Sequence, residues 1–316
     1  MPQVSVIVLT YNPDPAKLRQ TLTAAARQRE IDCEILISDD GSARKDFSFL
    51  PSFMQQLGVA NWRLLDNMEN AGTVKNCLGA VREAQGDYVF FTSPGDYLFD
   101  DYVLRDLYRF AEQNNAPLCF GNAVFYTAVD GQPRITQRYS APLQPQLYDP
   151  AVSAARMKAA FFGGSWIIGA SYFRRRTLAL TYLEKIADTS VYTEDTTTTA
   201  AALACGERLC YFARNVVWYE DGTGVSTSAS QRWKEILAQD VLQCFTKLRE
   251  EHPTDPYVDI LYRNVTVTNR ITRIAGKFFR HPILFVRILL CKWAKKIPIT
   301  YTAEDMRRLT ELLSIK

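Results

Sequence analysis

The chain opens with the apolar, β-branched run VSVIVLT at Val4–Thr10, and the turn residues YNP at 11–13 end it. A run of this length and composition is typical of a buried strand. Asp14 and Pro15 then begin a helical pattern, and a second apolar run, CEILIS, follows at residues 33–38. A strand, a helix and a strand at this spacing predict a parallel pair, which is the start of an α/β sheet.

The same alternation continues along the first half of the chain. A helical pattern at about residues 73–84 precedes the apolar strand YVFFT at Tyr88–Thr92, whereas residues 118–136 are extended and residues 141–150 are irregular. From residue 231 onward the pattern is helical. We predict an α/β protein with a mostly parallel central sheet flanked by helices at residues 1–230, and a helical extension at residues 231–316.

The composition is that of a globular protein, with 47% hydrophobic and 22% charged residues among 316. The formal net charge of +3 is too small to indicate a nucleic-acid partner, and none is expected. Seven scattered cysteines without a CxxC pair, and only two histidines, favour neither a disulfide framework nor a zinc site. The first residues have no signal-peptide pattern, so we expect a cytoplasmic protein.

Acidic residues stand in three places where strands are predicted to end. Asp39 and Asp40 follow the second strand, Asp96 follows the run YVFFTSPG, and the pair Glu194 and Asp195 precedes a predicted helix. The carboxyl ends of parallel strands are the edge at which α/β sheets bind ligands. The sequence therefore predicts a ligand cleft at this edge.

The segments TYN (Thr10, Tyr11, Asn12) and DDGS (residues 39–42) follow neighbouring strands and should lie together. The Asp39 carboxylate suits the N3–H of a uracil, and the Tyr11 ring suits its face. The alternative is a plain turn in which Ser42 caps the next helix.

Residues 70–76 (NAGTVKN) begin the third predicted helix. Amide groups around Gly72, together with Lys75, are suited to phosphate oxygens. The alternative is a simple helix cap with Lys75 in solvent.

The segment SPGD contains Ser93 and Asp96, and a carboxylate here suits Mg²⁺ or Mn²⁺ bridging two phosphates. An ordinary turn explains it equally well. Glu194 and Asp195 suit a general base, although the helix dipole alone favours acidic residues in a first turn.

Taken in order, TYN, DDGS, NAGTVKN, SPGD and TED (residues 193–195) resemble the family 2 inverting glycosyltransferases over about residues 3–228. The resemblance implies a GT-A fold and an enzyme of the bacterial cell-surface polysaccharide type. Such an enzyme moves a sugar from a nucleotide-sugar, here a UDP-sugar, to a hydroxyl of a glycan or of a polyprenyl-diphosphate-linked acceptor.

The resemblance also implies roles for individual residues. Thr10, Tyr11 and Asp39 would hold the uridine, Asp96 would bind the metal, and Asp195 would be the catalytic base. Glu194 would orient that base or touch the acceptor.

The chain departs from the family pattern in two places, the SPGD segment and the region of Tyr219. Ser93 and Gly95 stand where the family often has aspartates, and the chain has no histidine near Tyr219. Asp96, the diphosphate and water would therefore complete the metal's coordination. A glycine-bearing loop at residues 219–227 is similar to one that such bacterial enzymes carry.

The C-terminal extension is strongly basic and apolar. Between residues 270 and 300 there is no acidic residue, while eight basic ones occur: Arg270, Arg273, Lys277, Arg280, Arg287, Lys292, Lys295 and Lys296. Aromatic and aliphatic residues alternate with them, as in segments that lie on anionic bilayers, and we expect attachment to the cytoplasmic face of the inner membrane. The alternative is a helix whose apolar face packs on the core.

Three other functions compete with this interpretation. A non-catalytic nucleotide-sugar-binding module would fit the altered SPGD segment but leaves Glu194 and Asp195 without a role. A nucleotidyltransferase would carry a basic glycine-rich loop after the first strand, where this chain has YNP. A membrane scaffold would not explain the acidic clusters.

Overall fold

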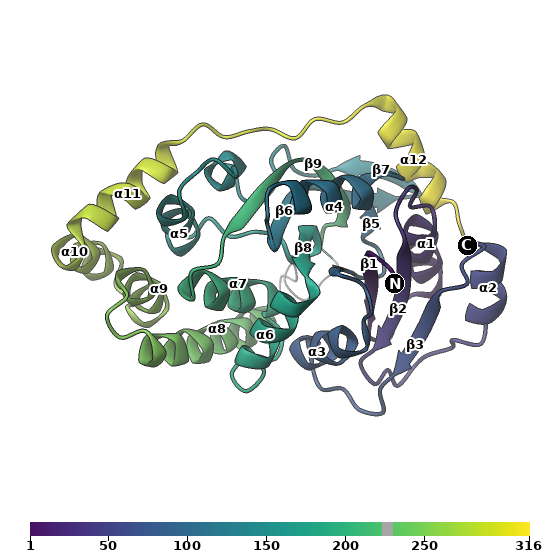
Figure 1. Ribbon diagram of the computed structural model, residues 1–316, viewed down its shortest axis with the longest axis horizontal. Helices are drawn as coiled ribbons and strands as arrows, with labels where there is room; N and C mark the ends of the chain where they lie inside the picture. Colours follow the sequence, from purple (N-terminus) through teal and green to yellow (C-terminus); the bar gives the residue numbers. More distant parts are fainter. Residues whose placement is uncertain (223–229) are drawn as a thin grey trace.

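The computed structural model describes residues 1–222 and 230–316, so part of the loop expected at residues 219–227 lies outside the described residues. Within them, a nine-stranded sheet has the order β3-β2-β1-β4-β8-β6-β9-β5, with β7 paired to β6 (Figure 1). The strands are β1 (Val4–Thr10), β2 (Cys33–Asp39), β3 (Trp62–Asp66), β4 (Tyr88–Thr92), β5 (Tyr97–Leu98), β6 (Leu118–Val129), β7 (Gln132–Ile135), β8 (Tyr172–Arg175) and β9 (Leu209–Glu220).

Helices flank this sheet. In the first two thirds of the chain they are α1 (Pro15–Ala26), α2 (Leu50–Gln56), α3 (Thr73–Glu83), α4 (Val103–Gln113), α5 (Ala154–Phe162), α6 (Arg176–Ile186) and α7 (Glu194–Ala204). The C-terminal helices are α8 (Gln231–Glu251), α9 (Pro256–Thr266), α10 (Arg270–Arg280), α11 (Pro282–Trp293) and α12 (Ala303–Leu313). The predicted α/β class with a C-terminal helical extension is confirmed.

The parallel part of the sheet is β3-β2-β1-β4. Thr10 pairs with Asp39, and Val8 pairs with Thr92, so three strands end side by side. Right-handed crossovers place α1, which leads toward β2, and α3, which leads back to β4, on opposite faces. This arrangement brings the predicted ligand segments to one edge.

The other part of the sheet is mixed. β8 is antiparallel to both β4 and β6, while β6 and β9 run parallel over most of their length. β9 is one continuous strand, because register shifts near Asn122 let its ladder with β6 continue past the irregularity.

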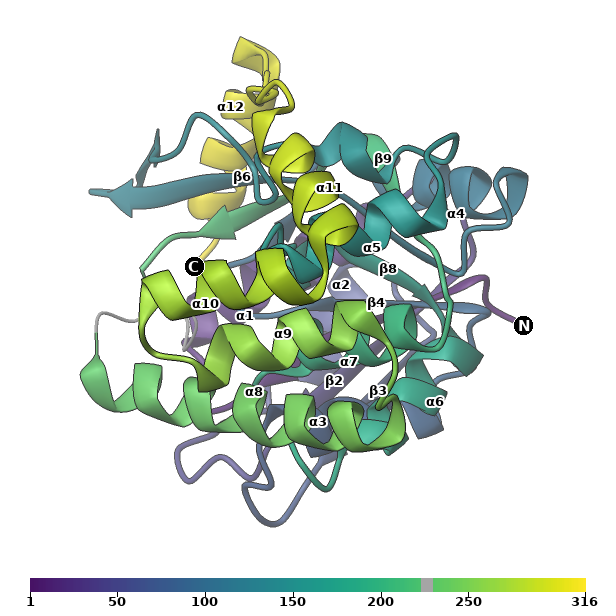
Figure 2. The ribbon, with the colours of Figure 1, turned by 90° about the vertical axis from the view of Figure 1, so that its left-hand side faces the viewer.

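The C-terminal helices reach both ends of the molecule. α8 to α11 cover α5 and α7 (Figure 2), whereas α12 crosses back to pack beside α1 (Figure 1). Leu309 and Leu312 of α12 are buried in a cluster with Tyr97 and Trp218. The boundary near residue 230 stays a prediction, but the segment beyond it contributes to the core.

Pro282 divides the basic segment into α10 and α11, as its missing amide requires. Within residues 1–222 and 230–316, no helix is both long and apolar enough to cross a bilayer.

Candidate active site

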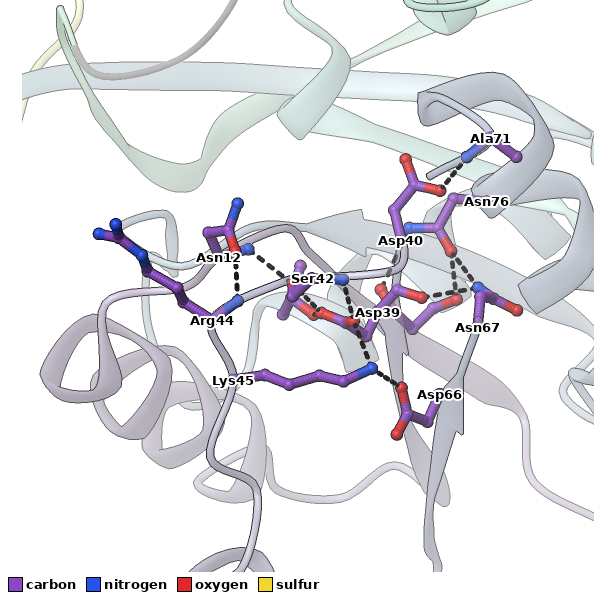
Figure 3. A network of polar contacts seen from close by, with 12 residues as sticks. Asn12, Asp39, Asp40, Ser42, Arg44, Lys45, Asp66, Asn67, Ala71 and Asn76 are labelled. Carbon is purple, nitrogen blue, oxygen red and sulfur yellow. Dashed lines mark hydrogen bonds and ion pairs between the residues drawn. The ribbon is translucent and has the colours of Figure 1, made fainter. Parts of the chain in front are cut away.

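The Asp39 carboxylate is fully buried and is held by four donors (Figure 3). Its Oδ1 accepts from Thr10 Oγ1 (2.9 Å) and Ser42 Oγ (2.5 Å), and its Oδ2 accepts from Ser42 N (2.8 Å) and from Lys45 Nζ at 3.4 Å. Ser42 does not cap the next helix, which begins at Leu50. The expected proximity of the TYN and DDGS segments is therefore observed.

Asn12 joins the TYN segment to the DDGS segment and to Arg44 through two hydrogen bonds. Its backbone N–H donates to Ser42 Oγ (2.6 Å), and its side-chain oxygen Oδ1 accepts from the backbone N–H of Arg44 (2.9 Å) (Figure 3). Tyr11 is left 55% exposed beside this network. An aromatic ring on a fixed backbone can stack on a planar ligand at low entropic cost.

The start of α3 is more constrained than the sequence suggests. Asp40 accepts from the amides of Ala71 (2.8 Å) and Gly72 (3.0 Å), and the amide of Val74 donates to the carbonyl of Val191 (2.9 Å). Three amides near the predicted phosphate site are thus already bound within the protein. The exposed Lys75 side chain remains the feature best suited to a phosphate.

Gly72 allows the start of α3 to lie directly against Val191. Its φ is +87°, and a Cβ there would lie 2.3 Å from Val191 Cγ1. The loop before α3 and the loop before α7 therefore touch, which joins the donor segments to the TED segment.

Asp96 lies in a turn beside the end of β9. The Glu220 amide donates to Asp96 Oδ1 (3.1 Å), and the Glu220 carboxylate is paired with Lys17 Nζ (2.6 Å). Burial raises the pKa of Asp96 to about 7; the Glu220 amide opposes this rise, and the Glu220 charge adds to it.

Glu220 fills the space that a side chain at position 95 would take. A Cβ on Gly95, whose φ is +103°, would lie 2.4 Å from Glu220 Oε2. A carboxylate from β9 thus lies directly beside position 95. The sequence did not identify Glu220 or Lys17, because they are distant along the chain.

The donor set at Asp96 fits a hard divalent cation. Glu220 is already paired with Lys17, whereas Asp96, whose pKa is raised, would gain stability from an adjacent cation. Among the residues that the structure describes, no cluster of three or more His, Cys, Asp or Glu side chains forms a metal cage. Phosphate oxygens and water would have to supply most ligands of such a cation.

Glu194 is buried in an ion pair with Arg174 of β8. Arg174 Nη1 lies 2.6 Å from Glu194 Oε1, and the guanidinium stacks 4.5 Å from the centre of the Tyr172 ring. This pairing favours an orienting role for Glu194 over contact with an acceptor. Arg174 had no distinguishing signal in the sequence.

Asp195 is only partly buried, unlike its neighbour Glu194. Its Oδ2 accepts from Gly169 N (3.1 Å) and its Oδ1 from Thr196 N (2.6 Å). Burial raises the pKa of Asp195 to about 6, and the charge of Glu194 adds to this rise. Such a carboxylate is ionised at neutral pH and basic enough to accept a proton.

Asp240 on α8 fixes the loop before α7. Its Oδ2 accepts from three successive amides, those of Val191 (2.9 Å), Tyr192 (2.6 Å) and Thr193 (3.2 Å). The C-terminal extension therefore positions the segment that carries Asp195, a role that the sequence did not reveal.

Two of the three acidic clusters converge on α3. The carboxylates of Glu194, Asp40 and Asp195 all lie close enough to the buried Cys77 thiol to raise its pKa, although burial is the larger cause. Asp96 lies beyond the end of β4, beside β1. The predicted nucleoside and metal residues thus follow the ends of neighbouring parallel strands, and the predicted base residues lie beside α3.

A parallel nucleotide-binding half joined to a mixed half with carboxylates at strand ends defines the GT-A class of fold. The chain belongs to Glycosyl transferase family 2, whose family model matches residues 5–177.

Two curated relatives are similar to parts of the chain. An uncharacterized glycosyltransferase of Haemophilus influenzae is 25% identical over 125 residues, which are 40% of this chain and 48% of that protein. An N-acetylglucosaminyltransferase of Bradyrhizobium elkanii is 29% identical over 106 residues, 33% of this chain and 58% of that protein. The matches span about half the length of these relatives.

Solved structures share the fold. S. aureus TarS in complex with UDP-GlcNAc superposes with a TM-score of 0.55 at 16% identity, covering 98% of this chain and 90% of that one. The mannosyltransferase PcManGT of Pyrobaculum calidifontis, in complex with GDP-Man and Mn²⁺, gives 0.52 at 16% identity, covering 92% and 86%. The expected GT-A fold is confirmed.

We predict that Asp240→Ala lowers the free energy of unfolding by about 1–3 kcal/mol, because three amides lose their acceptor. Urea denaturation measures the change. Asp240→Asn, which keeps an acceptor oxygen, should lose less. Asp188→Ala breaks only an exposed pair with Lys247 and should cost at most about 1 kcal/mol; equal losses at positions 188 and 240 would contradict the role of Asp240.

Proposed function

We propose that the chain is an inverting glycosyltransferase that moves a sugar from a nucleotide-sugar to a hydroxyl of a glycan or lipid-linked acceptor in surface polysaccharide synthesis. One observation carries this proposal: Asp195 is partly exposed with a pKa of about 6, while Glu194 beside it is immobilised by Arg174. The relative named N-acetylglucosaminyltransferase and the UDP-GlcNAc complex of TarS support a UDP-sugar as the donor.

In the proposed complex the nucleoside lies against Thr10, Tyr11, Asn12 and Asp39. A carboxylate has about four acceptor sites, and those of Asp39 are all engaged. The bond to Lys45 is the longest, so it is the one that a uracil N3–H would replace.

The diphosphate lies between the start of α3 and the SPGD segment, near Gly72, Lys75, Ser93 and Asp96. A bound Mg²⁺ or Mn²⁺ supplies positive charge beside the leaving diphosphate, and Asp96 with Glu220 would hold it.

Asp195 takes the proton from the acceptor hydroxyl as its oxygen attacks the anomeric carbon. The nucleoside diphosphate leaves from the opposite face, so an α-linked donor gives a β-linked product. A positioned base of this kind contributes about 10²–10⁴-fold to the rate.

We predict that Asp195→Asn abolishes sugar transfer while leaving donor binding within about twofold, because it removes the base but not a donor contact. Nucleotide-sugars are first ranked by thermal shift with and without Mn²⁺, and nucleoside diphosphate release is then measured with the selected donor. Asp130→Asn, in an exposed turn, serves as the matched control. Transfer by Asp195→Asn at the wild-type rate would refute the assignment, and selective binding without any turnover would favour the non-catalytic module.

We also predict that kcat/KM rises with pH to a plateau and has its acidic limb near pH 6, because Asp195 accepts a proton only when ionised. Below pH 6 the value should fall about tenfold for each pH unit. The measurement uses excess Mn²⁺ and checks donor binding over the same range. A rate that stays constant from pH 7 to pH 5 contradicts this role.

We propose further that α10 and α11 attach the protein to the cytoplasmic leaflet of the inner membrane. Four apolar side chains are each 79% exposed there, namely Ile271, Phe279, Ile283 and Trp293. With the eight basic residues of the same segment, they suit an anionic bilayer surface.

We predict that the full chain floats with vesicles containing phosphatidylglycerol, and that the bound fraction falls at high salt concentration. The double variant Phe279→Ser and Trp293→Ser should lose most binding, because about 1 kcal/mol or more of apolar contact is removed at each site. Val129→Ser, at an exposed apolar residue outside the segment, is the control. Flotation of the double variant equal to the wild type would exclude the proposed contact.

A further inference from the structure

A cavity of about 240 Å³ opens between α5, α11 and the loop at residues 141–147. Its lining is mainly aliphatic, with Leu143, Leu147, Ala159, Ala160 and Ile288 among the residues that form it. Such a lining excludes a strongly hydrated ligand and favours a hydrocarbon.

The walls of this cavity are held by specific contacts. Ile297 N donates to the carbonyl of Leu143 (3.1 Å), and Gln146 Nε2 donates to the carbonyl of Lys295 (2.6 Å). On the other side, a Cβ at Gly163 would lie 2.9 Å from Ile288 Cγ2, so glycine lets α5 approach α11 closely. These contacts fix the positions of the segments that form the cavity.

The cavity lining also includes a basic side chain, that of Lys292. No acidic residue occurs between Asp259 and Glu304 in the sequence. The pKa of Lys277 is lowered to about 8, mainly by burial, with smaller contributions from the charges of Lys292 and Arg273. A site of this charge attracts an anionic group.

Part of the cavity lining belongs to the same segment of chain as a contact of Asp195. Ser165 and Trp166 line the cavity, and Gly169 donates its amide to the Asp195 carboxylate. Three residue steps separate Trp166 from Gly169, so their Cα atoms lie at most about 11 Å apart. A phosphate linkage joined to a sugar can extend over such a distance.

We propose that this cavity binds the first part of the hydrocarbon chain of a prenyl-phosphate-linked acceptor, with Lys292 beside its phosphate and its sugar hydroxyl directed to Asp195. The inference deepens the proposed function and rests on it. A bulk phospholipid fits less well, because it carries no sugar for Asp195, whose carboxylate accepts from Gly169 three residues beyond the lining residue Trp166.

The test measures binding of geranylgeranyl phosphate, below its micelle concentration, to the full chain without any donor. Leu143→Trp places an indole in the mouth of the cavity and should weaken binding at least tenfold. Leu290→Trp makes the same substitution at an exposed position of α11 that does not line the cavity, and should change binding less than twofold. Unchanged binding by Leu143→Trp would overturn the proposal.

A second pair of variants tests the phosphate. Lys292→Gln should weaken the binding of geranylgeranyl phosphate at least fivefold but leave the binding of geranylgeraniol unchanged. Lys295→Gln should change the binding of neither compound. Competition by dioleoylphosphatidylglycerol with equal affinity would assign the cavity to bulk lipid and overturn the proposal. UDP-GlcNAc binding and turnover are measured separately, so a failure of sugar transfer is distinguishable from a failure of the cavity.

Discussion

The buried ion pair between Arg174 and Glu194 joins the sheet to the helix that carries Asp195. Removing either partner would leave a charge without compensation in the interior, a change that typically costs about 3–5 kcal/mol. The pair also has a chemical consequence, because the Glu194 charge helps to raise the pKa of Asp195 while Arg174 opposes that rise. Structure and proton affinity at the proposed base therefore depend on the same contact.

The C-terminal helices are integral to this arrangement. Asp240 of α8 binds the loop on one side of Asp195, and α11 packs on α5, whose C-terminal end leads into the Gly163–Gly169 segment on the other side. At the far end of the molecule, Gln20 Nε2 donates to the carbonyl of Ile315 (2.9 Å) and Leu309 of α12 is fully buried. A division of the chain near residue 230 would separate groups that hold each other in place.

The sequence predicted the features that depend on local pattern. The strand runs, the third helix, and Asp39 and Asp96 near strand ends follow from hydrophobic period and turn chemistry, and the structure places them as expected. Glu194 and Asp195 do not follow a strand, because the loop before them comes from α6. The partners of those acidic residues were not predictable, because Lys17 and Glu220 are 203 positions apart and Val191 and Asp240 are 49 apart. Their pairing depends on how whole elements pack. Position 95 shows this most clearly, since only the packed structure reveals that Glu220 occupies the space beside that glycine.

Helices α8 to α11 take part in both proposed properties of the protein, the attachment to a membrane and the transfer of a sugar. They present exposed aromatic and basic side chains on their outer surface, and their inner surface supplies Asp240 to the loop before α7. A lipid-linked acceptor that arrives along α11 would therefore meet a base whose position the same helices determine. Because Trp166 lines the cavity beside α11 and Gly169, three residues further on, donates to Asp195, the proposed hydrocarbon site and the orientation of Asp195 depend on one segment of chain. Attachment to a surface and transfer chemistry would then be coupled through the packing of α8 to α11 on α5 and α7.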